Sequence, residues 1–147
     1  MFIKLLTKKI FSMLSLIIGI VLVSIAGASK AIMDNLQFHF NRSIFKFDPV
    51  KYNQKFWDPT ISWENKYKEG SMTEPKFLGS TTFFVFLTDA WHFFQMVMLL
   101  SLFIGISLTA FYSGSFIYMI IKVIVLRSFF GLSFSIFFNK ILNVKTI

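Results

Sequence analysis

The sequence predicts an all-α integral membrane protein with two to three hydrophobic helices and an aromatic-rich polar loop between the first and the second. Hydrophobic residues make up 55% of the 147 residues, which is above the share typical of soluble proteins. They gather in long runs, and runs of about twenty apolar residues are long enough to cross a bilayer. The polar character is concentrated between these runs, since residues 30–80 hold 6 of the 7 acidic residues.

The first hydrophobic run covers residues 10–29 and contains no charged residue. Its length suffices for a membrane span, and three lysines among the first nine residues favour a cytoplasmic N-terminus. The small residues 26–28 (Ala-Gly-Ala) also resemble a signal-peptidase cleavage site. Two interpretations of residues 1–29 therefore stay open: a retained membrane anchor, which the length of the run favours, or a cleaved signal peptide.

Residues 30–80 form an aromatic-rich section that we expect at the membrane interface. Its ten aromatic residues argue against a disordered linker, but about fifty residues without disulfides rarely build a core of their own. The rings are therefore expected to pack on the interface, on the helices or on a partner. Asp-Pro pairs at 48–49 and 58–59 predict the starts of two short helices, and the second helix could continue to Gly70.

Residues 81–147 predict a helical hairpin. The second helix should run from about 89 to 112, with Thr88 as its cap and residues 81–87 as an interfacial piece. This register places Trp91 and Tyr112 at the two headgroup levels, where aromatic residues are enriched.

The third helix should run from about 115 to 139, and it carries two possible intramembrane charges, Lys122 and Arg127. If it returns antiparallel to the second helix, Arg127 lies near the middle of the bilayer, where a charge costs a few kcal/mol unless it is paired or hydrated. An interfacial or re-entrant segment stays open as the alternative.

Small residues recur at helical spacing along each hydrophobic run. Faces of this kind let helix backbones approach closely in lipid, so we expect the helices to associate with each other or with a partner. The faces consist of Ser15, Gly19 and Gly27 in the first run, Ser101, Gly105, Thr109 and Ser113 in the second, and Gly131, Ser135 and Asn139 in the third.

Asp89, His92 and Gln95 lie at intervals of three residues where the second helix begins. Because this spacing puts them along one side of a helix, they could act as a proton relay, as a metal site, or as a general base with its orienting carboxylate. Alternatively, Asp89 complements the positive end of the helix dipole, and His92 and Gln95 reach the headgroups or a neighbouring helix. Asp89 and His92 are the best catalytic candidates in either case.

Several classes of function lack support in the composition. The chain has no cysteine and only two histidines, His39 and His92, with no second histidine at ligand spacing, so we expect no metal site and no cofactor. It contains no nucleophile elbow and no glycine-rich phosphate loop. The net charge of +8 comes mostly from cations that flank apolar runs, so we expect anionic lipid rather than nucleic acid as their partner.

Three motifs follow one another between positions 57 and 92. They are a W-x-P-x-x-S-W-x-N-K-Y-K loop (Trp57, Pro59, Ser62, Trp63, Asn65, Lys66, Tyr67 and Lys68), an F-x-G-S-[ST] step (Phe77, Gly79, Ser80 and Thr81) and a T-D-A-W-H helix start (Thr88, Asp89, Ala90, Trp91 and His92). These motifs resemble those of an uncharacterised family of small integral membrane proteins from Bacteroidetes-type bacteria and their phages, and the likeness covers about a quarter of this chain. The resemblance implies that the tryptophan loop and the start of the second helix work as one unit, but it implies no activity.

These observations lead to three functional hypotheses. We expect a non-enzymatic interaction or accessory subunit of a bacterial inner membrane, in contact with the lipid bilayer and with copies of itself or another membrane protein. The alternatives are a pore-forming, holin-like oligomer in which Lys122, Arg127 and the Asp89 face line water, and a small membrane enzyme centred on Asp89 and His92. The expected interaction residues are Trp57, Asp58, Trp63, Asn65, Lys66, Trp91 and Gln95.

Overall fold

The computed structural model describes residues 2–69, 71–111 and 115–144. Three of its helices are long and apolar enough to cross a membrane, and they form an all-α integral membrane fold, as the sequence predicts. They are α1 (Phe2–Phe38), α4 (Ala90–Phe111) and α5 (Phe116–Ile136), and α5 continues into a wider, π-helical turn, η4 (Phe137–Leu142).

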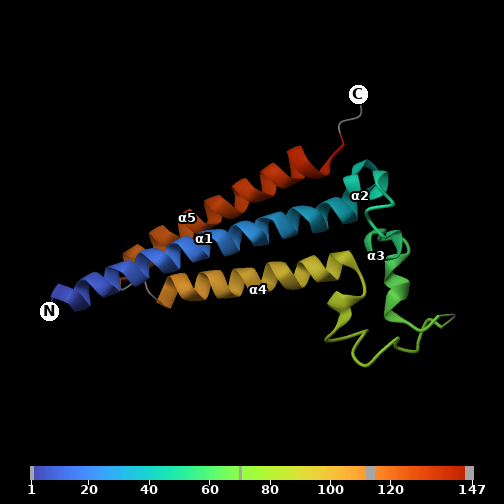
Figure 1. Ribbon diagram of the computed structural model, residues 1–147, viewed down its shortest axis with the longest axis horizontal. Coiled ribbons are helices and arrows are strands. Elements are labelled where there is room, and N and C mark those ends of the chain that lie inside the picture. The colour runs from blue at the N-terminus through green and yellow to red at the C-terminus, as the bar shows by residue number, and fades with distance from the viewer. Residues whose placement is uncertain (1, 70, 112–114, 145–147) are drawn as a thin grey trace.

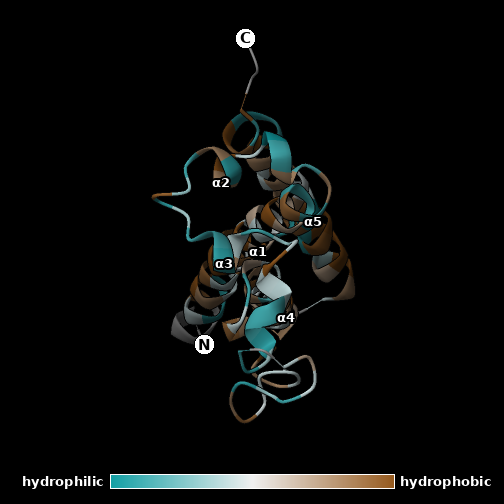
Figure 2. Ribbon diagram, turned by 90° about the vertical axis from the view of Figure 1, so that its right-hand side faces the viewer, coloured by the Kyte–Doolittle hydropathy of each residue, from teal (hydrophilic) through white to brown (hydrophobic). Residues whose placement is uncertain are grey.

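Helix α1 lies between α4 and α5 (Figure 1). It contacts both neighbours along much of its length, whereas α4 and α5 touch each other little. The chain direction makes α5 parallel to α1 and α4 antiparallel to it, so the start of α1 lies at one end of the bundle and residues 40–89 lie at the other (Figure 1). Seen from that second end, the hydrophilic segments gather on the side facing the viewer, and the helices behind them are largely hydrophobic (Figure 2).

Helix α1 extends well beyond the predicted run of residues 10–29 at both ends. Its last turns hold polar residues with partners in the fold: Lys30 forms an ion pair with Asp34 one turn later, and Asn35 Nδ2 donates to Asn143 Oδ1 at 3.0 Å. The Ala-Gly-Ala stretch at 26–28 therefore lies in mid-helix, and Ala26 is fully buried there.

The contact between α1 and α4 depends on small residues. Ser101, Gly105 and Thr109 are the buried positions of α4 after its first residue, so the predicted small-residue face of this helix packs inside the bundle. A β-carbon added at Gly19 would overlap the hydroxyl of Thr109, and one at Gly105 would lie 3.2 Å from Cβ of Leu22. Ser113, the last residue predicted for this face, lies outside the described residues.

Helix α5 packs on α1 through a face other than its small-residue face, so the prediction that this face meets a partner stays a prediction. Ser135 and Asn139 are exposed, and they bond to each other within the helix. The contact instead uses Ser133, whose hydroxyl donates to the carbonyl of Ser24 at 2.7 Å, and the backbone of α5, which lies against Gly27. Spacing alone does not distinguish these two faces, because serine occurs on both.

The short helices of residues 40–66 are η1 (Phe40–Arg42), α2 (Ile44–Phe47), α3 (Gln54–Trp57) and η2 (Ser62–Lys66). The prediction that the two Asp-Pro pairs start helices is wrong, since Asp48 and Asp58 follow α2 and α3 as their C-terminal caps. The residue before a proline is sterically disfavoured in the α-region, so each helix ends there. The predicted continuation towards Gly70 is a separate 3-10 helix that ends at Lys66.

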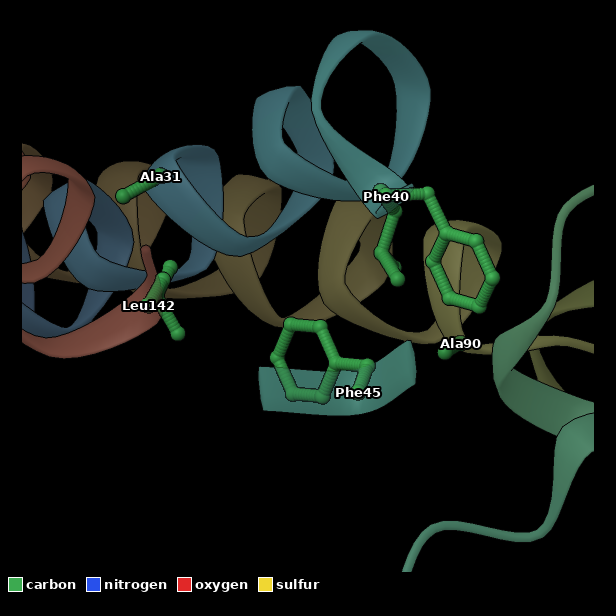
Figure 3. Packing of buried hydrophobic residues seen from close by; sticks show 6 residues of the cluster. Ala31, Phe40, Phe45, Ala90 and Leu142 are labelled. Carbon is green, nitrogen blue, oxygen red and sulfur yellow. The ribbon is translucent and has the colours of Figure 1, made fainter. Parts of the chain in front are cut away.

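A hydrophobic cluster joins residues 40–57 to the ends of the long helices (Figure 3). Phe45 and Trp57 stack with ring centroids 4.4 Å apart, and Tyr52 meets both rings edge-on. The end of α5 is tied to the same region, because Val144 N donates to the carbonyl of Arg42 at 2.9 Å. The buried members of the cluster are Ala31, Leu36, Phe40, Phe45, Ala90 and Leu142.

We expect Gly27→Ala to destabilise the bundle by about 1–3 kcal/mol, because the added methyl group would overlap the carbonyl oxygen of Phe130 and lie 3.2 Å from N of Phe134. Gly131→Ala is the matched control, since its methyl group would meet only the flexible guanidinium of Arg127. Thermal unfolding in detergent should show a lower midpoint for Gly27→Ala alone. Equal midpoints for the two variants would contradict the close contact of α1 with α5.

Candidate functional site

The candidate site lies where α4 begins. The 3-10 helix η3 (Val85–Leu87) leads into Thr88 and Asp89, and α4 starts at Ala90. The backbone N–H of His92 donates to Asp89 Oδ1 at 2.9 Å, which satisfies one of the free donors of the first turn. Asp89, and not Thr88 as predicted, is thus the capping residue; the Thr88 hydroxyl donates back to the carbonyl of Val85 at 2.6 Å.

Asp89 and His92 form a close pair. Nδ1 of His92 lies 2.8 Å from Oδ1 and 2.7 Å from Oδ2 of the carboxylate, and the hydroxyl of Thr88 lies 3.2 Å from Oδ2. Burial raises the pKa of the Asp89 carboxyl, but the hydrogen bonds from the His92 ring and backbone, with the charges of His92 and Lys66, lower it more, so the net pKa lies below the ordinary 3.8. Asp89 is therefore a carboxylate at neutral pH.

Asn65 fixes the start of α4 to the tryptophan loop. Its Nδ2 donates to the carbonyl of Thr88 at 3.0 Å and also to the carbonyl of Lys55. Farther along the loop, the hydroxyl of Ser80 donates to the carbonyl of Lys66 at 2.6 Å. These hydrogen bonds join segments that are far apart in the sequence. The tryptophan loop and the start of α4 therefore form one folded unit.

A pocket of about 280 Å³ opens beside the Asp89–His92 pair. It gathers four of the predicted site residues around the imidazole. It adds two polar side chains that were not predicted as site residues, Gln37 at the end of α1 and Ser62 in η2, and Ser62 was identified only as part of the loop motif. No local motif marks Gln37, because only the packing of α1 brings it to this pocket. The lining residues are Gln37, Pro59, Ser62, Trp63, Lys66, Asp89, Trp91 and His92.

Four predicted interaction residues do not line the pocket: Asn65, which bonds to the start of α4, and Trp57, Asp58 and Gln95. Trp57 packs in the hydrophobic cluster. Asp58 is buried and accepts hydrogen bonds from the backbone N–H and the hydroxyl of Thr60, at 2.9 and 2.7 Å. Gln95 is half-buried in α4 and makes no hydrogen bond to a described residue. The side chains of Trp57 and Asp58 therefore make contacts inside this chain.

The two predicted intramembrane charges lie in different surroundings. Lys122 is buried against α1, and its Nζ donates to the hydroxyl of Ser12 at 2.9 Å. Arg127 is exposed, with its guanidinium 5.8 Å from the centre of the Phe130 ring. The two cations therefore do not line a common path through this bundle.

The pocket could support proton transfer, because the carboxylate engages Nδ1 of His92 and the other ring nitrogen, Nε2, is left to act as donor or acceptor. Lys66 adds a positive charge that would favour an anionic group. Among the residues that the structure describes, no three histidine or acidic side chains come together in a way that could hold a metal ion. Neither a protein-family model, nor a curated protein, nor a solved structure matches this chain.

Asp89→Asn keeps an oxygen for the His92 amide but removes the negative charge at the start of α4, so we expect the free energy of unfolding to fall by about 1 kcal/mol at neutral pH. Because the folded pKa of Asp89 is lowered, its stabilisation is fully present above the ordinary 3.8 and is lost as pH falls through the lower folded value. The stability difference between the two proteins should shrink below pH 3.8 in chemical unfolding at a series of pH values. A difference that stays constant down to acid pH would contradict this role.

Proposed function

We propose that the protein is a non-enzymatic interaction or accessory subunit of a bacterial inner membrane. The observation that carries this proposal is an apolar loop, residues 77–87, that the chain does not use for its own core. Leu78 is 91% exposed and Phe83 is 88% exposed, and Phe84 and Leu87 are also exposed. Exposed apolar side chains gathered in one segment are typical of an interaction surface.

The place of this loop in the fold favours the bilayer surface as its partner. The last part of the loop, η3, packs against α4 and leads directly into it, so the loop lies at the level where α4 enters the membrane. Apolar and aromatic side chains are stabilised at this level by burial among the headgroups. The loop would hold residues 40–69 close to the membrane, and the faces of the long helices would remain available for a protein partner.

We further propose that α1 is a retained anchor and that its start faces the cytoplasm. The lysines before the first hydrophobic run support this orientation. The residues of the alternative cleavage site, 26–28, support retention, because cleavage there would remove most of the helix on which α4 and α5 pack. The loop motifs also support placing this chain in the small membrane-protein family that it resembles, and that placement remains a proposal.

The proposed function is tested by purification in a mild detergent from the membranes of a bacterium that naturally makes this chain. An accessory subunit should copurify with a defined second membrane protein at a fixed ratio. The ratio should be the same for His92→Gln and for the control His39→Gln, whose side chain lies outside the pocket. Recovery of the chain as a ring of identical subunits would favour the pore instead, and recovery of the chain alone would contradict a subunit role.

The Asp89–His92 pair supports a second candidate function, a small enzyme that uses His92 as a general base at the membrane interface. The supporting observation is the adjacent pocket, in which the imidazole lies near the side chains of Lys66 and Gln37. The headgroup level would give such a site access to a substrate in either water or lipid.

This second candidate predicts an unusually reactive imidazole. In the folded protein, diethyl pyrocarbonate should acylate His92 faster than His39, and Asp89→Asn should slow the reaction at His92 only, because the carboxylate no longer orients the ring. Peptide mass spectrometry gives both rates in one sample. If His92 reacts no faster than His39, in the presence or absence of Asp89, the enzyme candidate is contradicted. The Asp89–His92 pair would then serve only to cap α4.

A further inference from the structure

A second cavity, of about 330 Å³, lies among the three long helices. Because α4 and α5 touch each other little, a groove remains between them, and α1 closes it from behind with Val23. Its walls are apolar except for one residue, Arg127. The lining residues are Val23, Leu102, Ile106, Val123, Leu126, Arg127 and Phe130.

The groove lies near the middle of the bundle along the helix axes. Val23, Leu102 and Arg127 are all close to the midpoints of the spans Leu6–Phe38, Ala90–Phe111 and Phe116–Leu142. A bundle that crosses the hydrocarbon layer therefore carries Arg127 close to mid-membrane, where a charged side chain is costly unless a partner compensates it.

Arg127 finds no such compensation within the described part of this chain. Its guanidinium lies over the Phe130 ring and against Gly131, with Nη1 3.0 Å from the place of a β-carbon on that glycine. No described carboxylate forms an ion pair with it, and Arg127 is an exposed residue that lines the groove. A cation beside an apolar groove is complementary to a partner that carries a negative group at the same depth.

A second copy of this chain cannot supply that group at the same depth. The seven acidic residues all lie between positions 34 and 89. Asp34 is the only one inside a candidate span, it is paired with Lys30, and it lies roughly 16 Å along α1 from the level of Val23 at 1.5 Å per residue. Symmetric association of this chain therefore leaves Arg127 without a carboxylate.

We propose that the groove between α4 and α5 is the docking surface for a membrane-spanning helix of a different protein that carries an Asp or Glu near its midpoint. The carboxylate would pair with Arg127, and apolar side chains on either side of it would fill the groove. This inference rests on the proposed role as an interaction subunit, and it specifies the chemistry of the partner.

The phosphate of an anionic lipid is the other source of negative charge near a membrane. Headgroups lie about 15 Å from the middle of the hydrocarbon layer, so a phosphate reaches Arg127 only if the arginine bends to the surface or the bilayer deforms. A helix with a mid-span carboxylate meets Arg127 without either distortion, and the lining of the groove is apolar apart from Arg127.

The proposal can be tested with purified components and a synthetic partner. The chain has no cysteine, so Ile106→Cys places a single thiol in the groove and Ile104→Cys places one about half a turn away on the same helix. Each protein is reconstituted in phosphatidylcholine vesicles with a leucine-rich spanning peptide that carries a central Glu and one cysteine. The matched peptide has Gln in place of Glu.

Disulfide formation at Ile106→Cys should reach half its maximum at about tenfold less Glu peptide than Gln peptide. Arg127→Gln should abolish this preference and Arg127→Lys should retain part of it, while both variants keep the thermal midpoint of the parent because the side chain is exposed. Ile104→Cys should show no preference between the two peptides.

Equal reaction of the two peptides, or a preference that survives in Arg127→Gln, would overturn the proposal. Loss of the preference when phosphatidylglycerol replaces part of the phosphatidylcholine would also overturn it, because a lipid with a net negative charge would then satisfy Arg127. These outcomes are independent of the copurification experiment, so the groove assignment can fail while the role as an interaction subunit stands.

Discussion

The close contact of α1 with two other helices is the constraint on which the rest of this structure depends. Within lipid there is little hydrophobic gain from bringing apolar helices together, so packing and hydrogen bonds must hold the bundle. Gly19 lets α4 approach at the level of Thr109, and Gly27 lets the backbone of α5 approach near Phe130. Each contact occupies a different face of α1, which leaves α4 and α5 apart from one another.

The position of α1 between α4 and α5 shapes both regions of the protein to which we assign a function. At one end, α1 continues past the apolar run and carries Ala31 and Leu36 into the cluster that supports residues 40–57. The same extension brings Gln37 to the pocket beside His92. In the middle of the bundle, the separation of α4 from α5 creates the groove that Arg127 lines.

Much of the fold was predictable from the sequence. Long apolar runs specify the membrane helices, and the aromatic content of residues 30–80 indicates that this section packs instead of remaining disordered. The bounds of the second helix are close to those predicted, because Asp89 is both the last polar residue before the run and a good capping group. The positions of α2 and α3 were predicted wrongly, because an Asp-Pro pair can follow a helix as well as precede one.

The candidate site was predictable only where it is local. Asp89 and His92 are three residues apart on one helix, so spacing alone suggests their pairing. The rest of the site depends on long-range packing, which brings Gln37 and Ser62 to the pocket and forms the hydrogen bond from Asn65 to Thr88. No pattern in a single sequence encodes which distant residues come into contact. For the same reason, the sequence revealed a charge at Arg127 but not the groove that surrounds it.

The direct packing of an intact α1 on α5 is tested by a cysteine pair introduced at Ser24 and Ser133. The hydroxyl of Ser133 lies 2.7 Å from the carbonyl oxygen of Ser24, and the native chain has no cysteine. Mild oxidation of native membranes should produce an intramolecular disulfide in Ser24→Cys/Ser133→Cys, detected as a mobility shift that reduction reverses. The control pair Ser24→Cys/Ser128→Cys should not react, because Ser128 is exposed on α5. Absence of the disulfide in the first pair, or an equal yield in both pairs, would contradict the direct packing of α1 on α5.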